Sequence, residues 1–400
     1  MKAIILCAGK STRMHPLTLT RPKPLLKIMN KTILSHNLEQ MKGIISEAII
    51  VVGYKKEMII DAIGKNFRGI KITYAFQKEQ LGTGHAVLCA KKHIKKGEKF
   101  LIVPGDDLFS KKDIQNTLKH NLCVLAKEVD DPEKWGIIVT DKKGFITDIE
   151  EKPEKPKSKL ASTGLIVMDY KIINLLEKQR STKRGEIEIP GALKDLIKTE
   201  KVYCQKVEDY WLPIGYPWHI LEANEYFLSR IKKSEIKGKL SKAACVEGKI
   251  ILGKGSEILA GVHIEGNVAI GENTKIGPNC YIRGSTTIGN NCRVGQAVEL
   301  KNSVIGDNSK IPHLSYIGDS VIGNGCNLGA GTITANLRHN HGIIKTQVKD
   351  DLIETGRKKF GAVLGDNVHT GINTSIYPGR KLWPNTTTRP GEVVDKDKLE

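Results

Sequence analysis

Residues 264–282 read Ile264-Glu-Gly-Asn-Val-Ala-Ile270-Gly-Glu-Asn-Thr-Lys-Ile276-Gly-Pro-Asn-Cys-Tyr-Ile282. An aliphatic residue recurs at every sixth position of this stretch, and the same period runs unbroken from Leu252 to Leu300. A six-residue period fits neither an amphipathic helix nor an alternating strand. It is the period of a parallel β-helix, in which each hexad forms one face and three hexads complete a coil. We therefore predict a β-helix over residues 245–400.

The hexad pattern resembles that of the left-handed hexapeptide-repeat acyltransferases. This resemblance implies a left-handed coil and a homotrimer that assembles through the β-helix. A β-helix alone does not define a reaction, because the same solenoid can serve as a regulatory or assembly domain. The chemistry has to be sought in individual side chains.

Three runs within the repeat carry polar side chains that could form a site. They are VGQAVELK (residues 294–301), IPHLSYIGD (residues 311–319) and NLGAGTITAN (residues 327–336). Arg283 lies one coil before Lys301, so the two cations should stack on one side and could hold a sugar phosphate. A histidine such as His313 can take a proton from a sugar ammonium group near neutral pH.

These three runs resemble the patterns V-E-x-K, G-H-x-x-Y-x-G-D and N-x-G-A-G-T-I-x-x-N. Those patterns belong to the acetyltransferase half of the bacterial bifunctional enzymes that make UDP-N-acetylglucosamine. The resemblance implies that His313 is the general base of acetyl transfer from acetyl-CoA to glucosamine-1-phosphate. It also implies that Tyr316, Asn327 and Asn336 bind the amino sugar, and that the backbone N–H of Ala330 faces the developing oxyanion.

At the N-terminus, a short apolar strand over Lys2–Leu6 enters a loop of small residues that includes Ala8 and Gly9. The backbone N–H groups of such a loop can approach a polyphosphate, because small side chains do not obstruct it. Arg13 and Lys23 follow and supply positive charge. The loop lacks the first glycine of a Walker A motif, so it does not predict a P-loop fold.

Residues 6–24 resemble the signature of the sugar-1-phosphate nucleotidylyltransferase family, which is L-x-[AG]-G-x-[GS]-T-R followed by P-K. The resemblance implies that the loop with Ala8 and Gly9 holds a nucleoside triphosphate. It implies further that Arg13 contacts the leaving pyrophosphate and that Lys23 contacts the reacting phosphates.

Strand-like and helix-like runs alternate through the first half of the chain. Strands are expected over Lys2–Leu6, Ala48–Val52, Ile72–Phe76 and Phe100–Val103. This alternation predicts a Rossmann-like α/β domain with a mostly parallel sheet, and ligands bind beyond the carboxyl ends of such strands. Asp106 follows the last of these strands, and carboxylate oxygens suit Mg²⁺. We therefore expect Asp106 to be a magnesium ligand.

Residues 77–84 read Gln-Lys-Glu-Gln-Leu-Gly-Thr-Gly and resemble a stretch of the N-acetylglucosamine-1-phosphate uridylyltransferases. The resemblance implies contacts with uracil from Gln77, Gly82 and Thr83. UTP is therefore favoured over dTTP, although the base pocket need not exclude dTTP. A further match implies that Glu150 accepts hydrogen bonds from sugar hydroxyls and that Gly136 lies beside the sugar.

One position departs from the family pattern. The second metal ligand of the family is an Asp or Asn, and its position falls at Pro213, which has no coordinating side chain. Asp209 or a water molecule could take its place. The reaction itself requires no protein nucleophile, because a sugar-phosphate oxygen attacks the α-phosphorus in line and pyrophosphate leaves.

Composition limits the partners of the chain. The formal charge is +19, but aromatic residues make up only 5% of the sequence and no basic run is interleaved with them, so no nucleic-acid partner is expected. No apolar run reaches the length of a membrane span, so no membrane partner is expected. The eight cysteines form no C-x-x-C pair, which favours a reducing, cytoplasmic location.

These observations divide the chain into three parts. We expect a nucleotidylyltransferase domain over 1–228, a helical linker over 229–244 and an acetyltransferase β-helix over 245–400. The favoured hypothesis is a bifunctional enzyme that uses acetyl-CoA, UTP and sugar-1-phosphates to make UDP-N-acetylglucosamine.

Two alternatives remain open. In the first, only the α/β domain is active, on UTP or dTTP and glucose-1-phosphate, and the β-helix is a non-catalytic assembly domain. In the second, both domains are scaffolds, as in the subunits of translation initiation factor 2B. The pairing of His313 with Asn336 argues against the first alternative. The presence of Arg13, Lys23 and Asp106 argues against the second.

Overall fold

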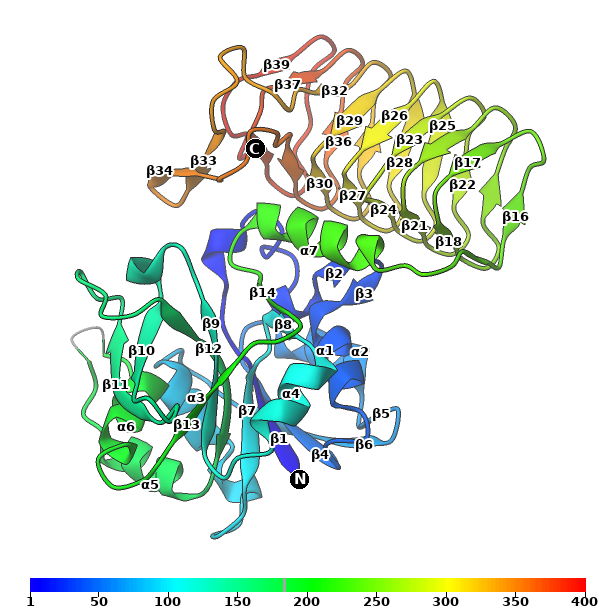
Figure 1. The fold of residues 1–400 in the computed structure, drawn as a ribbon. Coiled ribbons are helices and arrows are strands. Elements are labelled where there is room, and N and C mark those ends of the chain that lie inside the picture. Colours follow the sequence, from blue (N-terminus) through cyan, green and yellow to red (C-terminus); the bar gives the residue numbers. More distant parts are fainter. Residues whose placement is uncertain (183–184) are drawn as a thin grey trace. The chain divides into compact units, whose positions relative to one another are not determined.

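The computed structural model describes residues 1–182 and 185–400 and divides them into two compact units (Figure 1). The α/β unit comprises Met1–Lys10, Pro22–Leu25 and Ile33–Pro213. The β-helix unit comprises Ser11–Arg21, Leu26–Thr32 and Ile214–Glu400. No helix among the described residues is both long and apolar enough to cross a membrane.

A mixed sheet forms the centre of the α/β unit. Its parallel part has the order β7-β1-β4-β6, and the flanking strands are mostly antiparallel. The strands of this unit are β1 (Lys2–Cys7), β4 (Glu47–Val52), β5 (Asn66–Phe67), β6 (Ile70–Phe76), β7 (Phe100–Pro104), β8 (Asp107–Phe109), β9 (Cys123–Glu128), β10 (Gly136–Thr140), β11 (Ile146–Glu151), β12 (Leu160–Met168), β13 (Tyr203–Lys206) and β14 (Trp211–Pro213). The predicted α/β fold with a mostly parallel core is confirmed.

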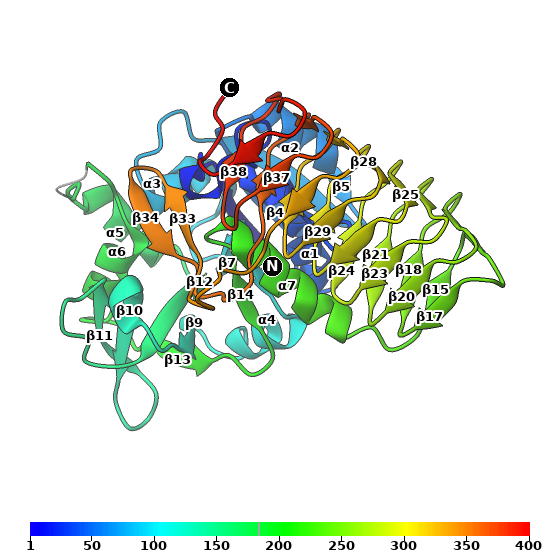
Figure 2. The same ribbon diagram turned by 90° about the horizontal axis from the view of Figure 1, so that it is seen from above.

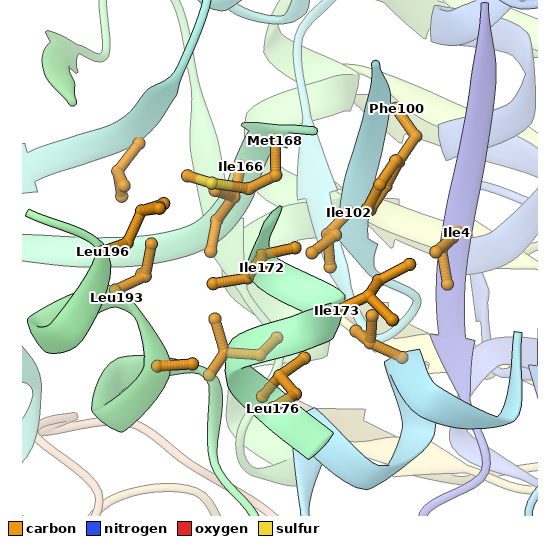
Figure 3. Packing of buried hydrophobic residues seen from close by; sticks show 14 of the residues in the cluster. Ile4, Phe100, Ile102, Ile166, Met168, Ile172, Ile173, Leu176, Leu193 and Leu196 are labelled. Atoms are coloured by element: carbon orange, nitrogen blue, oxygen red, sulfur yellow. The ribbon is translucent and has the colours of Figure 1, made fainter. Parts of the chain in front are cut away.

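Helices cover the sheet because their apolar side chains recur three or four positions apart. They are α1 (Ile33–Met41), α2 (Lys56–Ile63), α3 (Thr83–Cys89), α4 (Lys111–Thr117), α5 (Lys171–Lys178) and α6 (Ile189–Leu196). In α5, Ile172, Ile173 and Leu176 are fully buried and point toward the side chains of Ile4 and Ile102 (Figure 3). Burial of each such side chain contributes roughly 1.5–3 kcal/mol to folding.

Three parallel sheets form the β-helix (Figure 1, Figure 2). Ile264 pairs with Ile282 and Ile282 pairs with Leu300, so one coil takes eighteen residues, as the hexads predict. The first sheet contains β15 (Glu235–Ile236), β18 (Ile250–Leu252), β21 (Val268–Ile270), β24 (Thr286–Ile288), β27 (Val304–Ile305), β30 (Val321–Ile322), β35 (Val363–Leu364) and β38 (Lys381–Leu382). The second contains β16 (Lys239–Leu240), β19 (Glu257–Ile258), β22 (Lys275–Ile276), β25 (Arg293–Gln296), β28 (Lys310–His313), β31 (Asn327–Leu328) and β36 (His369–Thr370). The third contains β17 (Cys245–Glu247), β20 (His263–Glu265), β23 (Tyr281–Arg283), β26 (Glu299–Lys301), β29 (Tyr316–Gly318), β32 (Ile333–Thr334), β37 (Ser375–Ile376) and β39 (Val393–Val394). The predicted left-handed parallel β-helix is confirmed.

The prediction of a helical linker over 229–244 is wrong. Helix α7 covers Pro217–Ser229, and the chain then enters the first coil, where β15 and β16 pair with β18 and β19. Figure 1 shows α7 running alongside the coils of its own unit. The unit also contains the short 3-10 helix Thr12–Met14, the hairpin of β2 (Lys27–Ile28) and β3 (Lys31–Thr32), and a second hairpin of β33 (Lys345–Val348) and β34 (Asp351–Glu354).

Candidate active sites

The loops that follow the parallel strands of the α/β unit are joined to one another by backbone hydrogen bonds. Tyr54 donates to the carbonyl oxygen of Ala8 (3.1 Å), and Gly105 donates to that of Leu6 (3.0 Å). A Cβ atom at Gly53 would lie 2.8 Å from the carbonyl oxygen of Gln77 and 2.9 Å from that of Ala8. The structure therefore brings Ala8 and Gln77 together at the carboxyl edge of the sheet, where only a glycine fits between them.

The side chain of Gln77 closes its own loop. The buried Nε2 atom donates to the carbonyl oxygen of Gly82 (3.1 Å) and lies 3.1 Å from Nδ1 of His85. Gly82 has a φ of +96°, and a Cβ there would lie 2.5 Å from a backbone oxygen of Ile187. The hydroxyl of Thr83 accepts from the backbone N–H of Ile189 (3.3 Å). The loop is thus fixed between β6 and the segment that leads into α6.

Lys23 and Asp106 form an ion pair beside the end of β1. The Nζ atom of Lys23 lies 2.8 Å from Oδ2 of Asp106. The lysine side chain is 5% exposed, whereas the carboxylate is 42% exposed. Burial, and then the charge of Asp106, raise the pKa of the Cys7 thiol well above its ordinary value. Cys7 therefore stays neutral next to the pair, and the free edge of the Asp106 carboxylate faces solvent.

Pro213 lies where the missing metal ligand was expected. Strand β14 pairs with β8 so that Pro213 stands opposite Asp107, the residue after Asp106. The Asp107 carboxylate itself accepts from Nε1 of Trp211 (3.0 Å). Asp209 lies at the other end of β14, where its backbone N–H donates to the carboxylate of Asp113. Asp209 is thus held at Asp113 and precedes β14, whereas Pro213 stands beside Asp107, and this placement does not favour Asp209 as the replacement ligand.

The two residues expected at the sugar lie on paired strands. Gly136 begins β10, and Glu150 of β11 pairs with Ile137. The carboxylate of Glu150 accepts from Nζ of Lys157 (2.6 Å), which is itself half-exposed. Among residues 1–182 and 185–400, no hydrogen bond or ion pair joins Glu150 to Lys23 or Asp106.

Arg13 belongs to the β-helix unit, in the 3-10 helix Thr12–Met14. Its guanidinium carbon lies 5.3 Å from the centroid of the Tyr216 ring, at the start of α7. A cation over an aromatic face is attracted by the ring quadrupole. The side chain remains exposed and can reach a ligand.

In the β-helix, three of the predicted site residues, Lys301, Asn336 and Tyr316, lie around the buried carboxylate of Asp319. Asp319 is 2% exposed, and its Oδ2 atom accepts from Nζ of Lys301 (2.9 Å) and from Nδ2 of Asn336 (2.6 Å). The same Asn336 nitrogen lies 3.0 Å from the hydroxyl of Tyr316. Burial first, and then the charge of Asp319, raise the pKa of Tyr316, so its phenol keeps its proton.

Arg283 stacks on Lys301 as predicted, because β23 and β26 pair in that register. Nη1 of Arg283 donates to Glu299 (3.3 Å). Both cations line an open cleft with Glu222 and Glu225 of α7. Asp319 was not among the predicted site residues, although it closes the IPHLSYIGD run. Its importance comes from contacts with neighbouring coils, which a linear motif does not display.

His313, Ala330 and Asn327 lie on two adjacent coils. His313 ends β28 and is exposed, and the backbone N–H of Gly331 donates to its carbonyl oxygen (3.4 Å). Asn327 pairs with Lys310 at the start of the same pair of strands. Within the described part of the chain, no hydrogen bond joins the His313 ring to Tyr316 or Asn336. The structure thus brings His313 close to the Ala330 loop but not into the Asp319 cluster.

Two family models match the chain. The model for nucleotidyl transferases covers residues 2–230, and a model described as the GMPPB C-terminal domain covers residues 264–387. A solved structure, described as a putative glucose-1-phosphate thymidylyltransferase from Bacillus anthracis, matches with a TM-score of 0.52 and 26% identity. That match covers 59% of this chain and 98% of the other.

Several curated proteins match over the full length. The bifunctional protein GlmU of Methanocaldococcus jannaschii is 43% identical and covers 99% of this chain and 95% of its own. The bifunctional sugar-1-phosphate nucleotidylyltransferase/acetyltransferase of Sulfurisphaera tokodaii is 39% identical and covers 99% and 98%. The UTP–glucose-1-phosphate uridylyltransferase AglF of Haloferax volcanii is 37% identical over 54% of this chain and 92% of its own.

Fold, sites and matches define a nucleotidyltransferase joined to a hexapeptide β-helix. The chain belongs to the nucleotidyl transferase family and, by matches over 99% of its residues, to its bifunctional nucleotidylyltransferase/acetyltransferase branch.

Proposed function

We propose that the protein acetylates glucosamine-1-phosphate with acetyl-CoA and then transfers UMP from UTP to the resulting N-acetylglucosamine-1-phosphate, releasing pyrophosphate. The observation that carries this proposal is the Asp319 cluster, which presents Lys301, Tyr316 and Asn336 on one side of the β-helix. A purely structural coil has no need for a buried carboxylate with cationic and amide partners, because an unpaired or half-paired charge is costly to bury.

In the α/β unit, the residues present fit a magnesium site with a single protein carboxylate. Mg²⁺ is commonly held by one or two carboxylates together with substrate phosphates, and Asp106 offers an exposed carboxylate edge. When bound, the ion supplies charge stabilisation for the phosphates. Lys23 orients and neutralises the reacting phosphates, and Arg13 the leaving pyrophosphate. Ala8, Gly9, Gln77, Gly82 and Thr83 hold the nucleotide, and Gly136 and Glu150 hold the sugar.

In the β-helix, Arg283 and Lys301 bind the sugar phosphate, and Tyr316, Asn327 and Asn336 bind the sugar. His313 takes a proton from the substrate ammonium group, and the freed amine attacks the thioester carbon. The backbone N–H of Ala330 stabilises the oxyanion. The nitrogen of the tetrahedral adduct then loses its second proton to water, the C–S bond breaks and the amide forms. The proton held by His313 passes to the departing CoA thiolate, so the products are the amide, CoA-SH and one proton in solution.

The first alternative, a non-catalytic assembly domain, has one point in its favour. The β-helix matches a model described as the GMPPB C-terminal domain, and this description does not mention acetyl transfer. The Asp319 cluster and the full-length bifunctional relatives favour the acetyltransferase instead.

We further propose a homotrimer formed through the β-helix and a cytoplasmic location. The location is supported by eight cysteines that are all free thiols, as expected in a reducing compartment. The functional boundaries that we propose are 1–228 for uridylyl transfer and 245–400 for acetyl transfer, with the first coil starting before residue 245.

A substrate matrix tests the proposal. Purified protein is incubated with each sugar-1-phosphate, with UTP or dTTP, and with or without acetyl-CoA, and the products are identified by mass. The expected products are N-acetylglucosamine-1-phosphate and UDP-N-acetylglucosamine. Formation of a nucleotide sugar without any acetylation of glucosamine-1-phosphate would leave the assembly-domain alternative standing.

His313→Ala separates the two activities. Acetyl transfer should fall by roughly 10²–10⁴, the usual contribution of a positioned general base. Uridylyl transfer from ready-made N-acetylglucosamine-1-phosphate should remain near the parent rate. Raising the pH should partly rescue the variant, because more of the substrate amine is then already deprotonated. An unchanged acetylation rate would show that the base is another group.

A further inference from the structure

Two N-terminal stretches, one within the signature and one directly after it, belong to the β-helix unit rather than to the α/β unit. These stretches, Ser11–Arg21 and Leu26–Thr32, are here called the signature arms. Between them, Pro22–Leu25 returns to the α/β unit and carries Lys23. The chain on both sides of this short segment is therefore held within the β-helix unit.

Asp366, which follows β35, holds the first arm. One of its oxygens accepts from the hydroxyl of Thr20 (2.7 Å) and from the guanidinium of Arg21. The other oxygen accepts from the backbone N–H of Asn324 on the preceding coil (2.8 Å). The arginine and aspartate side chains are 17% and 12% exposed. A largely buried, charge-assisted pair of this kind is stronger and more directional than a surface ion pair.

The second arm is held in the same way. Lys27 pairs with the carboxylate of Asp307, whose other oxygen accepts from the backbone of Asn290 (2.9 Å). Nδ2 of Asn30 donates to the carbonyl oxygen of Ile288 (2.9 Å). The apolar side chains of Leu17 and Leu26 are buried. They line, with Ile220 of α7, a small enclosed cavity against the coils.

We propose that Asp366 is a positioning residue for nucleotidyl transfer, although it lies in the β-helix. It fixes Arg21, and only one residue, Pro22, separates Arg21 from Lys23. Prolines on both sides of Lys23 restrict the backbone there, so a displacement of Arg21 is passed on to Lys23. This inference rests on the proposed uridylyl transfer.

The test uses the full-length chain with Asp366→Asn. The amide keeps an oxygen for the backbone of Asn324 but loses the charge that binds Arg21. The kcat of uridylyl transfer should fall about ten- to hundredfold, because misplacement by about 1 Å can cost 10²-fold. The KM for the sugar phosphate and the rate of acetyl transfer should change little. A role confined to stability would lower both activities together.

Four further variants complete the test. Arg21→Gln should reproduce the effect, and the double variant should be no worse than the more impaired single one, whereas Arg21→Lys should retain more activity than Arg21→Gln. Glu392→Gln is the matched control, because Glu392 pairs with Lys398 in the β-helix and makes no hydrogen bond to the signature arms among the described residues.

The possible results are distinct. An active parent whose Asp366→Asn variant keeps the parent kcat would overturn this inference alone. An equal loss with Glu392→Gln would also overturn it, because any disturbance of the β-helix would then suffice. A parent chain without uridylyl transfer would refute the proposed function and this inference together.

Discussion

At the scale of single residues, two carboxylates organise the two sites, and their exposure separates their roles. The Asp106 side chain is 42% exposed and, among the residues that the structure describes, pairs only with Lys23, so it can bind a further ligand. Asp319 is 2% exposed and already accepts from Lys301, Asn302 and Asn336. A saturated, buried anion does not bind substrate. It fixes the groups around it, which is the support that a binding site requires.

Asp106→Asn should lower uridylyl transfer by at least about a hundredfold. The carboxamide is nearly isosteric, so the fold should be kept, with some loss of stability because the buried Lys23 ammonium loses its counter-charge. The change also removes the charge that we propose to bind Mg²⁺, and an ion of this kind supplies several kcal/mol of charge stabilisation. The measurement is initial rate against magnesium concentration, with thermal unfolding as the check on folding. Near-parent turnover by a well-folded variant would show that Asp106 is not the ligand.

Two companion variants make this test specific. Asp209→Asn should leave uridylyl transfer and its magnesium dependence unchanged, because Asp209 lies at the far end of β14. Pro213→Asp places a carboxylate opposite Asp107 and should lower the magnesium concentration needed for half-maximal rate. An unchanged titration would mean that another group already completes the site.

At the scale of elements, the six-residue period was sufficient to predict the β-helix. One position of each hexad points into the core, and from Leu252 to Leu300 that position is always Leu, Ile or Val. The residues at every sixth position from Leu252 to Leu300 are at most 2% exposed. The start of the solenoid was missed for a reason that can be stated. Leu240 and Val246 continue the same six-residue phase, and both pack on the β-helix core. The charged residues around them are typical of a solvated helix, so the coil is recognised only when the six-residue period is extended from Leu252 toward the N-terminus.

The last coil carries a lysine in an apolar setting. Lys381 is 2% exposed and donates to the carbonyl oxygen of Gln347, while its backbone N–H donates to Asp397 (2.9 Å). Burial lowers the pKa of Lys381 from 10.5 to about 8, and the nearby Asp397 opposes this shift. The protonated lysine is therefore disfavoured in the folded chain relative to the unfolded chain.

This pKa shift predicts a pH dependence of stability. Between about pH 8 and pH 10.5 the unfolded chain binds more protons at this residue than the folded chain, so the free energy of unfolding rises with pH. The slope from this residue is up to about 1.4 kcal/mol per pH unit. Lys381→Met should remove that rise, measured by urea unfolding at pH 7.5, 8.5 and 9.5 relative to the parent. Lys239→Met, an exposed lysine of β16, is the control.

The outcome is read from the difference between the two unfolding curves. Other titrating groups are common to parent and variant, so they cancel. If the parent and Lys381→Met change in parallel from pH 7.5 to 9.5, the lysine is not held in a low-dielectric site.

At the scale of the whole molecule, sequence order and structural units do not coincide. From the order of the motifs, we predicted that the whole signature lies in a first domain over residues 1–228. In the structure, Ser11–Arg21 belongs to the β-helix unit instead. Arg21 and Asp366 are 345 positions apart, and Lys27 and Asp307 are 280 apart. No period or local propensity reports contacts at such separations. The prediction that Ala8, Gln77 and Asp106 share one edge of the sheet was possible because each follows a parallel strand, and the carboxyl ends of parallel strands lie at the same edge.

A chain that ends at residue 230 should therefore lose both activities. If the first 228 residues formed an independent domain, removal of the β-helix would abolish acetyl transfer alone. The signature arms would instead lose the carboxylates that pair with Arg21 and Lys27, and Leu17 and Leu26 would lose part of their apolar cover. Uridylyl transfer from ready-made N-acetylglucosamine-1-phosphate is the measurement, at matched concentrations of folded protein. Full-length His313→Ala is the control, since it lacks acetyl transfer but keeps the β-helix. A truncated chain with the parental kcat would show that the arms hold their position without the coils.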